Sequence, residues 1–163
     1  MAQIFELYTL GRELSRDEVI DALAAMPDAY RAVIEGAAAG ALERADGDGW
    51  SAIDVLKHVR DVVQVYGVRF KWMILDDDPF LPNYDEDRWV AESPDGASHA
   101  DDILREIAAY RAETVRLLRA LDGAGWSRTG RHEVIGPLVL EPYVRHELVH
   151  EEQHLEQLRA ALG

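Results

Sequence analysis

The chain has 163 residues, with 31 Asp and Glu against 17 Lys and Arg and no cysteine. This length fits a single domain over 1–163 with a full hydrophobic core, and the lack of cysteine excludes disulfides, thiolate metal sites and a cysteine nucleophile. The formal net charge of −14 argues against nucleic acid and anionic membranes as partners.

The first helix signal stands at Ser15, because Ser followed three residues later by Glu18 forms a capping box. The pattern predicts a helical region over 16–44 with a break near Pro27, since proline lacks the backbone N–H and clashes with the preceding turn. The cluster of Asp and Gly at 46–49 then predicts a turn. Residues 1–14 are compatible with a short lead-in or a strand.

A second capping signal, Ser51 to Asp54, opens a helix that we expect to run to Leu75. Its apolar residues recur at spacings of three and four, which is typical of a buried helix face. The members of this face are Val55, Val59, Val62, Tyr66, Phe70 and Met73. His58 directly precedes Val59, so we expect its side chain at the edge of the buried face.

Residues 76–97 form a long acidic connection that holds three of the six prolines. Long connections in compact domains are often functional or carry a short helix, and Asp85–Glu92 is the candidate here. Tyr84 and Trp89 either cover an opening to the core or pack on a surface loop. Ser98 to Asp101 then caps a third long helix over 99–121, followed by an irregular or extended stretch.

The last segment, Tyr143–Leu162, contains no Gly or Pro and predicts one helix that starts near Pro142. Its narrow apolar stripe comprises Val144, Leu148, Leu155, Leu158 and Leu162, with Glu151 inside it. His150 and His154 share one shoulder of this stripe with Glu147, whereas His146 points roughly 160° away. Four main helices and little strand predict an all-α, antiparallel four-helix bundle.

Three histidines therefore occupy matching shoulders of two core-facing helices, His58 on one and His150 with His154 on the other. A bundle can build a metal site in this way, and neutral imidazole suits Zn, Ni, Fe or Cu. Three protein ligands leave an open position for water or substrate, as catalytic sites do. The alternative is that these are exposed histidines, or core histidines that carboxylates satisfy.

Neighbouring carboxylates are candidates for supporting roles in such a site. Asp54 and Asp61 are placed to orient the imidazole of His58. Glu147 and Glu151 are candidates to orient His150 and His154, or to act as a catalytic base.

A competing interpretation uses His146-Glu147-x-x-His150, which fits the H-E-x-x-H helix motif of zinc peptidases. Thirteen residues follow His150, which leaves little room for a third ligand downstream. The longer form of the motif is absent, and no sheet is expected that could bind a peptide as an added strand.

Two segments resemble the DinB-like superfamily in their order and spacing. WSAIDVLKH over 50–58 is similar to the opening of that family's second helix. WSRTGRHEVIGPLVL over 126–140, with RHELVHEEQHLEQL over 145–158, is similar to the segment that leads into and forms its fourth helix. The chain departs from the family pattern at Val139, where a capping Thr is common, and at Gln153, where another His is common.

The resemblance implies a four-helix bundle whose metal is held by His58, His150 and His154, with no requirement for histidine at 146. It also implies metal-dependent transfer or isomerisation that uses a low-molecular-weight thiol such as mycothiol or bacillithiol, and a homodimer. Zn or Ni is the expected metal, with Fe or Mn as alternatives.

We therefore predict a metal-dependent thiol transferase, or a related hydrolase or isomerase, with a small-molecule thiol and an electrophile as substrates. A non-catalytic metal-binding or interaction bundle is the alternative from another class, and a zinc peptidase is the third. Because the sequence has no membrane-length apolar run and no signal-like N-terminus, we expect a cytoplasmic protein without membrane partners.

Overall fold

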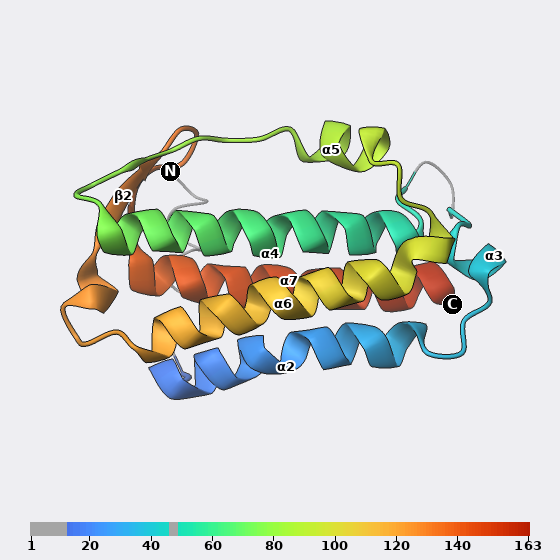
Figure 1. Cartoon of the computed structure of the whole chain (residues 1–163), viewed down its shortest axis with the longest axis horizontal. Coiled ribbons are helices and arrows are strands. Elements are labelled where there is room, and N and C mark those ends of the chain that lie inside the picture. Colours follow the sequence, from blue (N-terminus) through green and yellow to red (C-terminus); the bar gives the residue numbers. More distant parts are fainter. Residues whose placement is uncertain (1–12, 46–48) are drawn as a thin grey trace.

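Four long helices form the body of the molecule (Figure 1): α2 (Arg16–Ile34), α4 (Ala52–Leu75), α6 (Ala100–Arg119) and α7 (Leu140–Leu162). The structure is a computed structural model, and it describes residues 13–45 and 49–163. The predicted all-α four-helix bundle is confirmed. Most of the lead-in at 1–14 and of the turn at 46–49 lies outside the described residues.

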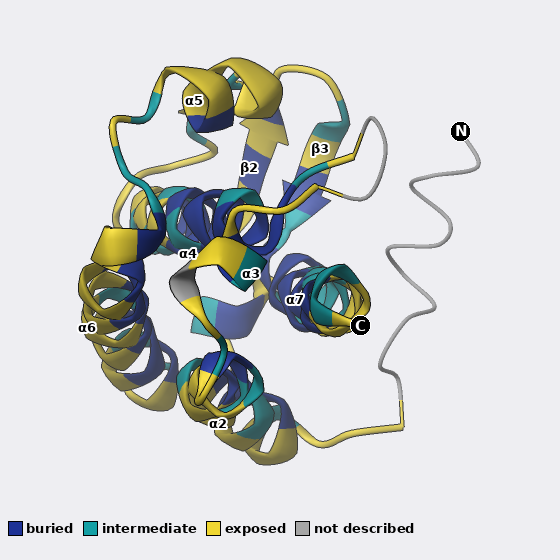
Figure 2. Cartoon of the chain, turned by 90° about the vertical axis from the view of Figure 1, so that its right-hand side faces the viewer, coloured by how far each residue is buried: buried dark blue, intermediate teal, exposed yellow. Residues whose placement is uncertain are grey.

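The chain path differs from a simple up-and-down bundle. The connection after α4 runs back along the bundle before α6 begins, so α4 and α6 point in the same direction (Figure 1). Seen from the end, the four helices occupy the corners of a square, with buried residues facing inward (Figure 2). Helix α4 packs against both α6 and α7. The neighbours α4 and α7 run antiparallel, and they are the two helices that carry the candidate histidines.

Helix α2 begins as predicted, with the Ser15 side chain accepting from the backbone N–H of Glu18. The predicted break at Pro27 is wrong, because the helix continues through it to Ile34. Proline costs about 3 kcal/mol in a helix interior, but Leu23 and Tyr30 on either side are fully buried. Their packing outweighs that cost. The predicted helical region over 16–44 is therefore shorter, and the four-residue α3 (Ala39–Leu42) follows separately.

The long connection contains β1 (Phe80–Leu81), α5 (Glu86–Glu92) and the 3₁₀ helix η1 (Ala97–His99). The short helix predicted here is confirmed, with Asp85 as its N-cap. Helix α6 begins at Ala100 with His99 at the N-cap, so the predicted cap at Ser98 is wrong. The reason is local, because the 3₁₀ turn takes up the residues that were expected to open the α-helix.

Residues 125–139 fold into the 3₁₀ helix η2 (Gly125–Ser127) and a hairpin of β2 (Thr129–His132) and β3 (Gly136–Val139). Strand β1 pairs in parallel with β2, which gives a three-stranded sheet in the order β1-β2-β3. Gly130 lets this sheet lie close to α4, because a Cβ at that position would come within 3.0 Å of the Met73 side chain.

The core consists of two apolar clusters along the bundle axis. One contains Phe70 and Val144 near the sheet, and the other contains Val59 and Leu158 near the opposite end. A buried polar layer of Arg111, Glu147 and Glu151 lies between them along α6 and α7.

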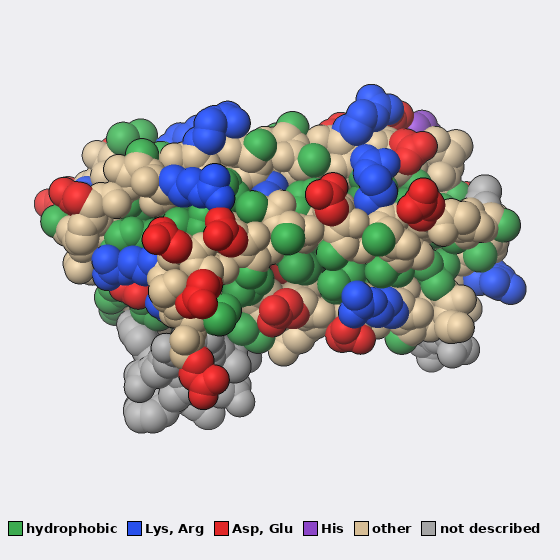
Figure 3. Space-filling view, turned by 90° about the horizontal axis from the view of Figure 1, so that it is seen from below, with side chains coloured by type: hydrophobic (Ala, Val, Ile, Leu, Met, Phe, Trp, Pro, Cys, Tyr) green, Lys and Arg blue, Asp and Glu red, His purple; other side chains and the backbone are tan. Residues whose placement is uncertain are grey.

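The surface mixes charges of both signs. Acidic and basic side chains are interspersed over the face on the α2 side of the bundle (Figure 3). Ion pairs such as that between Arg119 and Asp21 join α6 to α2. Among the described residues, no helix combines the length and the apolarity needed to cross a membrane.

Candidate metal centre

Helix α4 positions His58 through its N-terminal cap. The Ser51 side chain accepts from the Asp54 backbone N–H and donates to the Asp54 carboxylate at 2.6 Å, which fixes the first turn. His58 lies one turn further on and is 1% exposed. The Trp50 ring packs on it with a centroid distance of 4.7 Å, so apolar surface covers the side of the imidazole that faces the bundle end.

Helix α7 supplies the other two imidazoles. His154 lies between its partners, because its Nε2 is 3.0 Å from Nε2 of His58 and 3.0 Å from Nε2 of His150. One nitrogen from each ring falls within 4.8 Å of the others. The rings meet edge to face, at 66° to 83°. The three nitrogens thus converge on one point, as the shoulder positions in the sequence predict.

All three rings are held in the neutral form. Burial, with the adjacent His154, lowers the pKa of His58 to about 3. Burial and the neighbouring rings likewise lower the pKa of His150 to about 3. The pKa of His154 is also lowered by burial, against an opposing contact with Gln157. Neutral imidazole is the form that binds a metal.

Gln157 fixes the tautomer of His154. Its Oε1 lies 2.8 Å from His154 Nδ1, and a carbonyl oxygen can only accept, so Nδ1 carries the proton. The Nε2 lone pair then faces the other two rings. A hydrogen bond of this kind on the outer nitrogen is how proteins orient a metal-binding histidine.

The predicted orienting carboxylates of His58 are wrong. Asp54 is engaged by Ser51 and by Lys57, whose Nζ is 2.8 Å away, and Asp61 pairs with Arg60. Nδ1 of His58 is buried without a hydrogen-bond partner in the described structure, as is Nδ1 of His150. Glu86 of α5 lies 4.0 Å from Nδ1 of His58 and is half exposed. It can therefore reach this nitrogen with a small side-chain movement.

These observations fit a divalent ion. A tetrahedral site with metal–nitrogen bonds of about 2.0–2.1 Å needs its nitrogens about 3.3 Å apart, close to the spacing seen here. The Nε2 atoms of His58 and His150 each lie 3.0 Å from Nε2 of His154, and a cation between the three rings would take up their lone pairs. Three imidazoles without thiolate suit Zn, Ni, Fe or Cu and leave room for a further ligand.

Glu147 and Glu151 face the bundle core. Both are fully buried, and both accept from Nη2 of Arg111, with 2.9 Å to Glu147 Oε1. Burial raises the pKa of Glu151 to about 8, against the opposing charge of Arg111. No hydrogen bond or ion pair joins either carboxylate to the three histidines among the described residues, so the prediction that they orient the imidazoles is wrong. Their role as a catalytic base stays a prediction.

His146, which was predicted to point roughly 160° away from the apolar stripe, is half-buried, because α7 buries a wider arc than that stripe. Its Nδ1 is 3.1 Å from the Tyr66 hydroxyl, and its ring stacks on His150 at 5.9 Å. The candidate metal-binding group contains His150 without His146, and Glu147 contacts Arg111. The geometry therefore does not support the zinc-peptidase interpretation of H-E-x-x-H.

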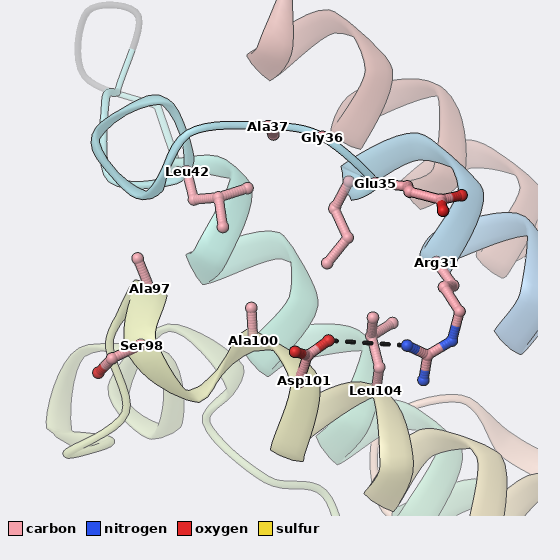
Figure 4. Close-up of a pocket in the computed structure, with 11 residues that line it drawn as sticks. Arg31, Glu35, Gly36, Ala37, Leu42, Ala97, Ser98, Ala100, Asp101 and Leu104 are labelled. Atoms are coloured by element: carbon pink, nitrogen blue, oxygen red, sulfur yellow. Dashed lines mark ion pairs between the residues drawn. The ribbon is translucent and has the colours of Figure 1, made fainter.

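Two of the hollows on the described surface differ in their position relative to the three histidines. One, of about 430 Å³, lies at the bundle end between α2, α3 and α6, where Arg31 and Asp101 approach to 3.6 Å (Figure 4). The three histidines do not line it. The other, of about 590 Å³, is lined by Asn83, Tyr84, Asp85, Glu86 and Glu133. Because Glu86 also approaches His58, this second hollow lies on the metal-centre side of the molecule.

Two residues of the site were not predicted from the sequence, Gln157 and Arg111. Gln157 lies three residues after His154, a spacing at which helix side chains meet. Arg111 lies four residues after Ile107 and four before Val115, both buried. An arginine at an inward position of α6, opposite an inward Glu151 on α7, was a signal for a buried ion pair.

The fold and the site define a four-helix bundle with a three-histidine cluster between two antiparallel helices. A family model of the DinB superfamily matches residues 11–158. The chain therefore belongs to the DinB superfamily, which confirms the resemblance found in the sequence.

Individual relatives agree with this assignment. A protein of Bacillus mycoides (strain KBAB4), named as an inferred metal-dependent hydrolase, is 30% identical over 119 residues, which cover 71% of this chain and 68% of that protein. YfiT from Bacillus subtilis, described as a probable metal-dependent hydrolase with an unusual four-helix bundle topology, superposes with a TM-score of 0.85 at 21% identity, over 94% of this chain and 88% of its own. TT2238, a four-helix bundle protein, superposes with a TM-score of 0.63 at 21% identity, over 90% of this chain and 99% of its own. The two structures establish the shared fold.

Proposed function

We propose that this protein is a divalent-metal enzyme whose centre is held by His58, His150 and His154. The observation that carries the proposal is the convergence of three neutral imidazoles, one buried and two half-buried, whose ligand nitrogens lie within 4.8 Å of one another. The names of the Bacillus mycoides and Bacillus subtilis relatives, which refer to metal-dependent hydrolases, support the presence of a divalent metal.

The residues of this chain would have different roles around such an ion. The three histidines hold it, and Gln157 keeps the proton of His154 on Nδ1. Trp50 covers His58 and excludes water from that side. When bound, a divalent ion would supply Lewis acidity that lowers the pKa of a thiol or water in its open position.

We propose thiol transfer as the reaction, with a low-molecular-weight thiol and a small electrophile as substrates. The observation that favours thiol transfer is the placement of the carboxylates, because Glu147 and Glu151 both form ion pairs with Arg111. Activating water requires a shift from a pKa near 15.7, with a base to accept the proton, whereas a thiol starts near 8.5. Because Arg111 holds the two core-facing carboxylates, the smaller pKa shift that a thiol needs suits this centre better. The thiol would lose its proton to solvent, and its sulfur would form a bond to the electrophilic carbon as the leaving group departs with its electron pair.

Hydrolysis is the second candidate, and the name of the 30% identical relative favours it. In that case water would take the place of the thiol. Glu86, at 4.0 Å from Nδ1 of His58, is the carboxylate in the described structure that is nearest to the three rings and can act with them.

The test measures metal content and chemistry together. Protein purified without chelator is analysed for bound metal, and the consumption of a chlorinated electrophile is followed with bacillithiol, with mycothiol and without thiol. We expect about one equivalent of metal in the wild type and less than a tenth of that in His150→Ala. His99→Ala is the control, because His99 is exposed at the N-cap of α6. Equal metal content in the wild type and in His150→Ala would reject the proposed metal centre. Turnover of the electrophile without any thiol would show that the reaction is hydrolysis and not thiol transfer.

A further inference from the structure

Among the described residues, Arg69 of α4 is a buried cation without an anionic partner. It is 4% exposed, and no carboxylate lies within 4.0 Å of it among the described residues. The other two buried cations of the described chain are paired, Lys57 with Asp54 and Arg111 with Glu147 and Glu151. Arg69 is therefore the exception within this bundle.

The contacts of Arg69 are neutral. Nη1 donates to the Tyr143 hydroxyl at 2.9 Å, and Nη2 donates to the backbone carbonyl of Pro82. The guanidinium lies 5.9 Å from the centres of the Tyr66 and Tyr84 rings. A guanidinium has five N–H donors, so these acceptors leave several donors unused. A buried charge is costly unless an opposite charge pairs with it.

A continuous layer of side chains links Arg69 to the metal centre along the α4–α7 interface. The Tyr66 ring stacks on His150 with a centroid distance of 6.4 Å, and the same ring faces the Arg69 guanidinium. The Tyr66 hydroxyl meets His146 at 3.1 Å. A molecule bound at His150 therefore needs to extend past only one aromatic ring to reach Arg69.

We propose that Arg69 binds a carboxylate of the substrate whose reacting group sits at the three-histidine centre. The inference rests on the proposed function and adds a substrate class to it, a carboxylate-bearing thiol or electrophile. A single guanidinium matches a single negative charge, and the planar fork of arginine matches the carboxylate geometry.

The surroundings also select against more highly charged ligands. Tyr84 lines the open hollow of about 590 Å³ and also faces Arg69, so it stands between the two. The hollow carries Asp85, Glu86 and Glu133. These carboxylates would repel a dianion such as a phosphate ester more strongly than a monoanion.

The main experiment uses 6-mercaptohexanoate and its uncharged methyl ester as probes of the zinc-loaded protein, with binding measured by calorimetry. We expect the wild type to bind the acid about tenfold more tightly than the ester, because the acid gains charge-assisted hydrogen bonds. Arg69→Gln should bring that ratio close to one. Arg131→Gln is the matched control, because Arg131 is a surface arginine on β2 that pairs with Asp78. A ratio that is near one in the wild type, or equal in wild type and Arg69→Gln, would overturn the proposal.

A second measurement needs no metal and no thiol. The thermal midpoint of the metal-free protein is compared in sodium acetate and in sodium chloride of the same ionic strength. Acetate should raise the midpoint of the wild type but not that of Arg69→Gln. Without acetate, Arg69→Gln should unfold at or above the wild-type midpoint, because the substitution removes an unpaired buried charge.

If Arg69 has only a structural role, the thermal midpoints should show the opposite results. In that case Arg69→Gln unfolds below the wild type or fails to fold, and acetate has no specific effect on either chain. Should the wild type bind no zinc, the proposed function fails, while the acetate comparison still decides the role of Arg69.

Discussion

Gln157 is the residue that most directly sets the chemistry of His154. Replacing it in Gln157→Leu removes the acceptor at 2.8 Å from Nδ1 and frees the ring to rotate or change tautomer. Losing such a partner typically lowers metal affinity about 10- to 100-fold. We expect a loss of that size in competition against a chromophoric chelator.

Gln153→Leu is the control for this prediction. Gln153 is exposed on the same helix, and among the described residues no hydrogen bond joins its side chain to the three histidines. Its substitution should leave metal affinity within about twofold of the wild type. If the two leucine variants bind metal equally well, Gln157 does not hold the tautomer.

Arg111 is the only cation in the buried polar layer that it forms with Glu147 and Glu151. Arg111→Met leaves Glu147 and Glu151 buried without a cation, and breaking a buried ion pair in this way costs about 3–5 kcal/mol. Urea unfolding of the metal-free protein should show a loss of that order.

Removing the whole polar layer should be far less harmful than removing one member. The triple variant Arg111→Met, Glu147→Leu and Glu151→Leu should unfold within about 1 kcal/mol of the wild type, because buried ion pairs and apolar groups of similar size are often equivalent. A triple variant that is as unstable as Arg111→Met alone would show that the layer stabilises the fold in its own right.

At the level of elements, the cap of α4 is expected to support the metal centre. Ser51→Ala removes the hydroxyl of a capping box about two turns before His58, and loss of a cap costs about 1 kcal/mol. Ser15→Ala removes the equivalent cap of α2, which holds none of the three histidines.

Both substitutions should lower the free energy of unfolding by a similar amount in urea titrations. Metal affinity should fall only in Ser51→Ala, because fraying of the first turn of α4 displaces His58. An equal effect of the two variants on metal affinity would mean that the caps act through global stability alone.

The elements could be predicted wherever local chemistry decides them. The apolar face of α4, the capping boxes at Ser15 and Ser51 and the short helix after Asp85 all follow from side-chain spacing and cap chemistry. Pro27 was predicted to break α2 because its cost is local and visible in the sequence. The burial of Leu23 and Tyr30 that offsets the cost is tertiary, so the sequence alone did not reveal it.

The site, too, has features that local helix geometry decides and features that tertiary packing decides. The shoulder positions of His58, His150 and His154 depend on helix geometry, and these three rings do meet. The partners of the surrounding carboxylates depend on what lies across the bundle. Arg111 comes from α6, so predicting the pairing of Glu147 and Glu151 required knowing that α6 lies across the bundle from α7.

At the scale of the whole molecule, the centre shapes how stability depends on pH. Burial lowers the pKa of His58 and His150 from 6.5 to about 3 in the folded chain. Below pH 6.5 the unfolded chain takes up protons on both rings that the folded chain does not. The metal-free protein should therefore lose stability as the pH falls from 7 to 5, measured by urea midpoints in the presence of EDTA.

The titration of Glu151 changes the stability of the folded chain in the opposite direction. Burial raises its pKa from 4.5 to about 8, so between these values the folded chain holds a proton that the unfolded chain has lost. Its contribution falls as the pH rises. The double variant His58→Asn and His150→Asn should accordingly lose less stability than the wild type between pH 7 and 5, and His132, whose pKa burial lowers to about 4, contributes to the dependence that remains. A double variant with the full wild-type dependence would contradict the neutral, buried state of the two rings.

The central claim is that three imidazoles from α4 and α7 hold one divalent ion. The most direct measurement is an anomalous-scattering map from crystals grown without added metal or chelator, recorded on both sides of the absorption edge of the element found. The account predicts one strong peak at about 2.0–2.1 Å from Nε2 of His58, His150 and His154. A map with no peak there, or with a peak bound by His146 and His150 in place of His58, would contradict it.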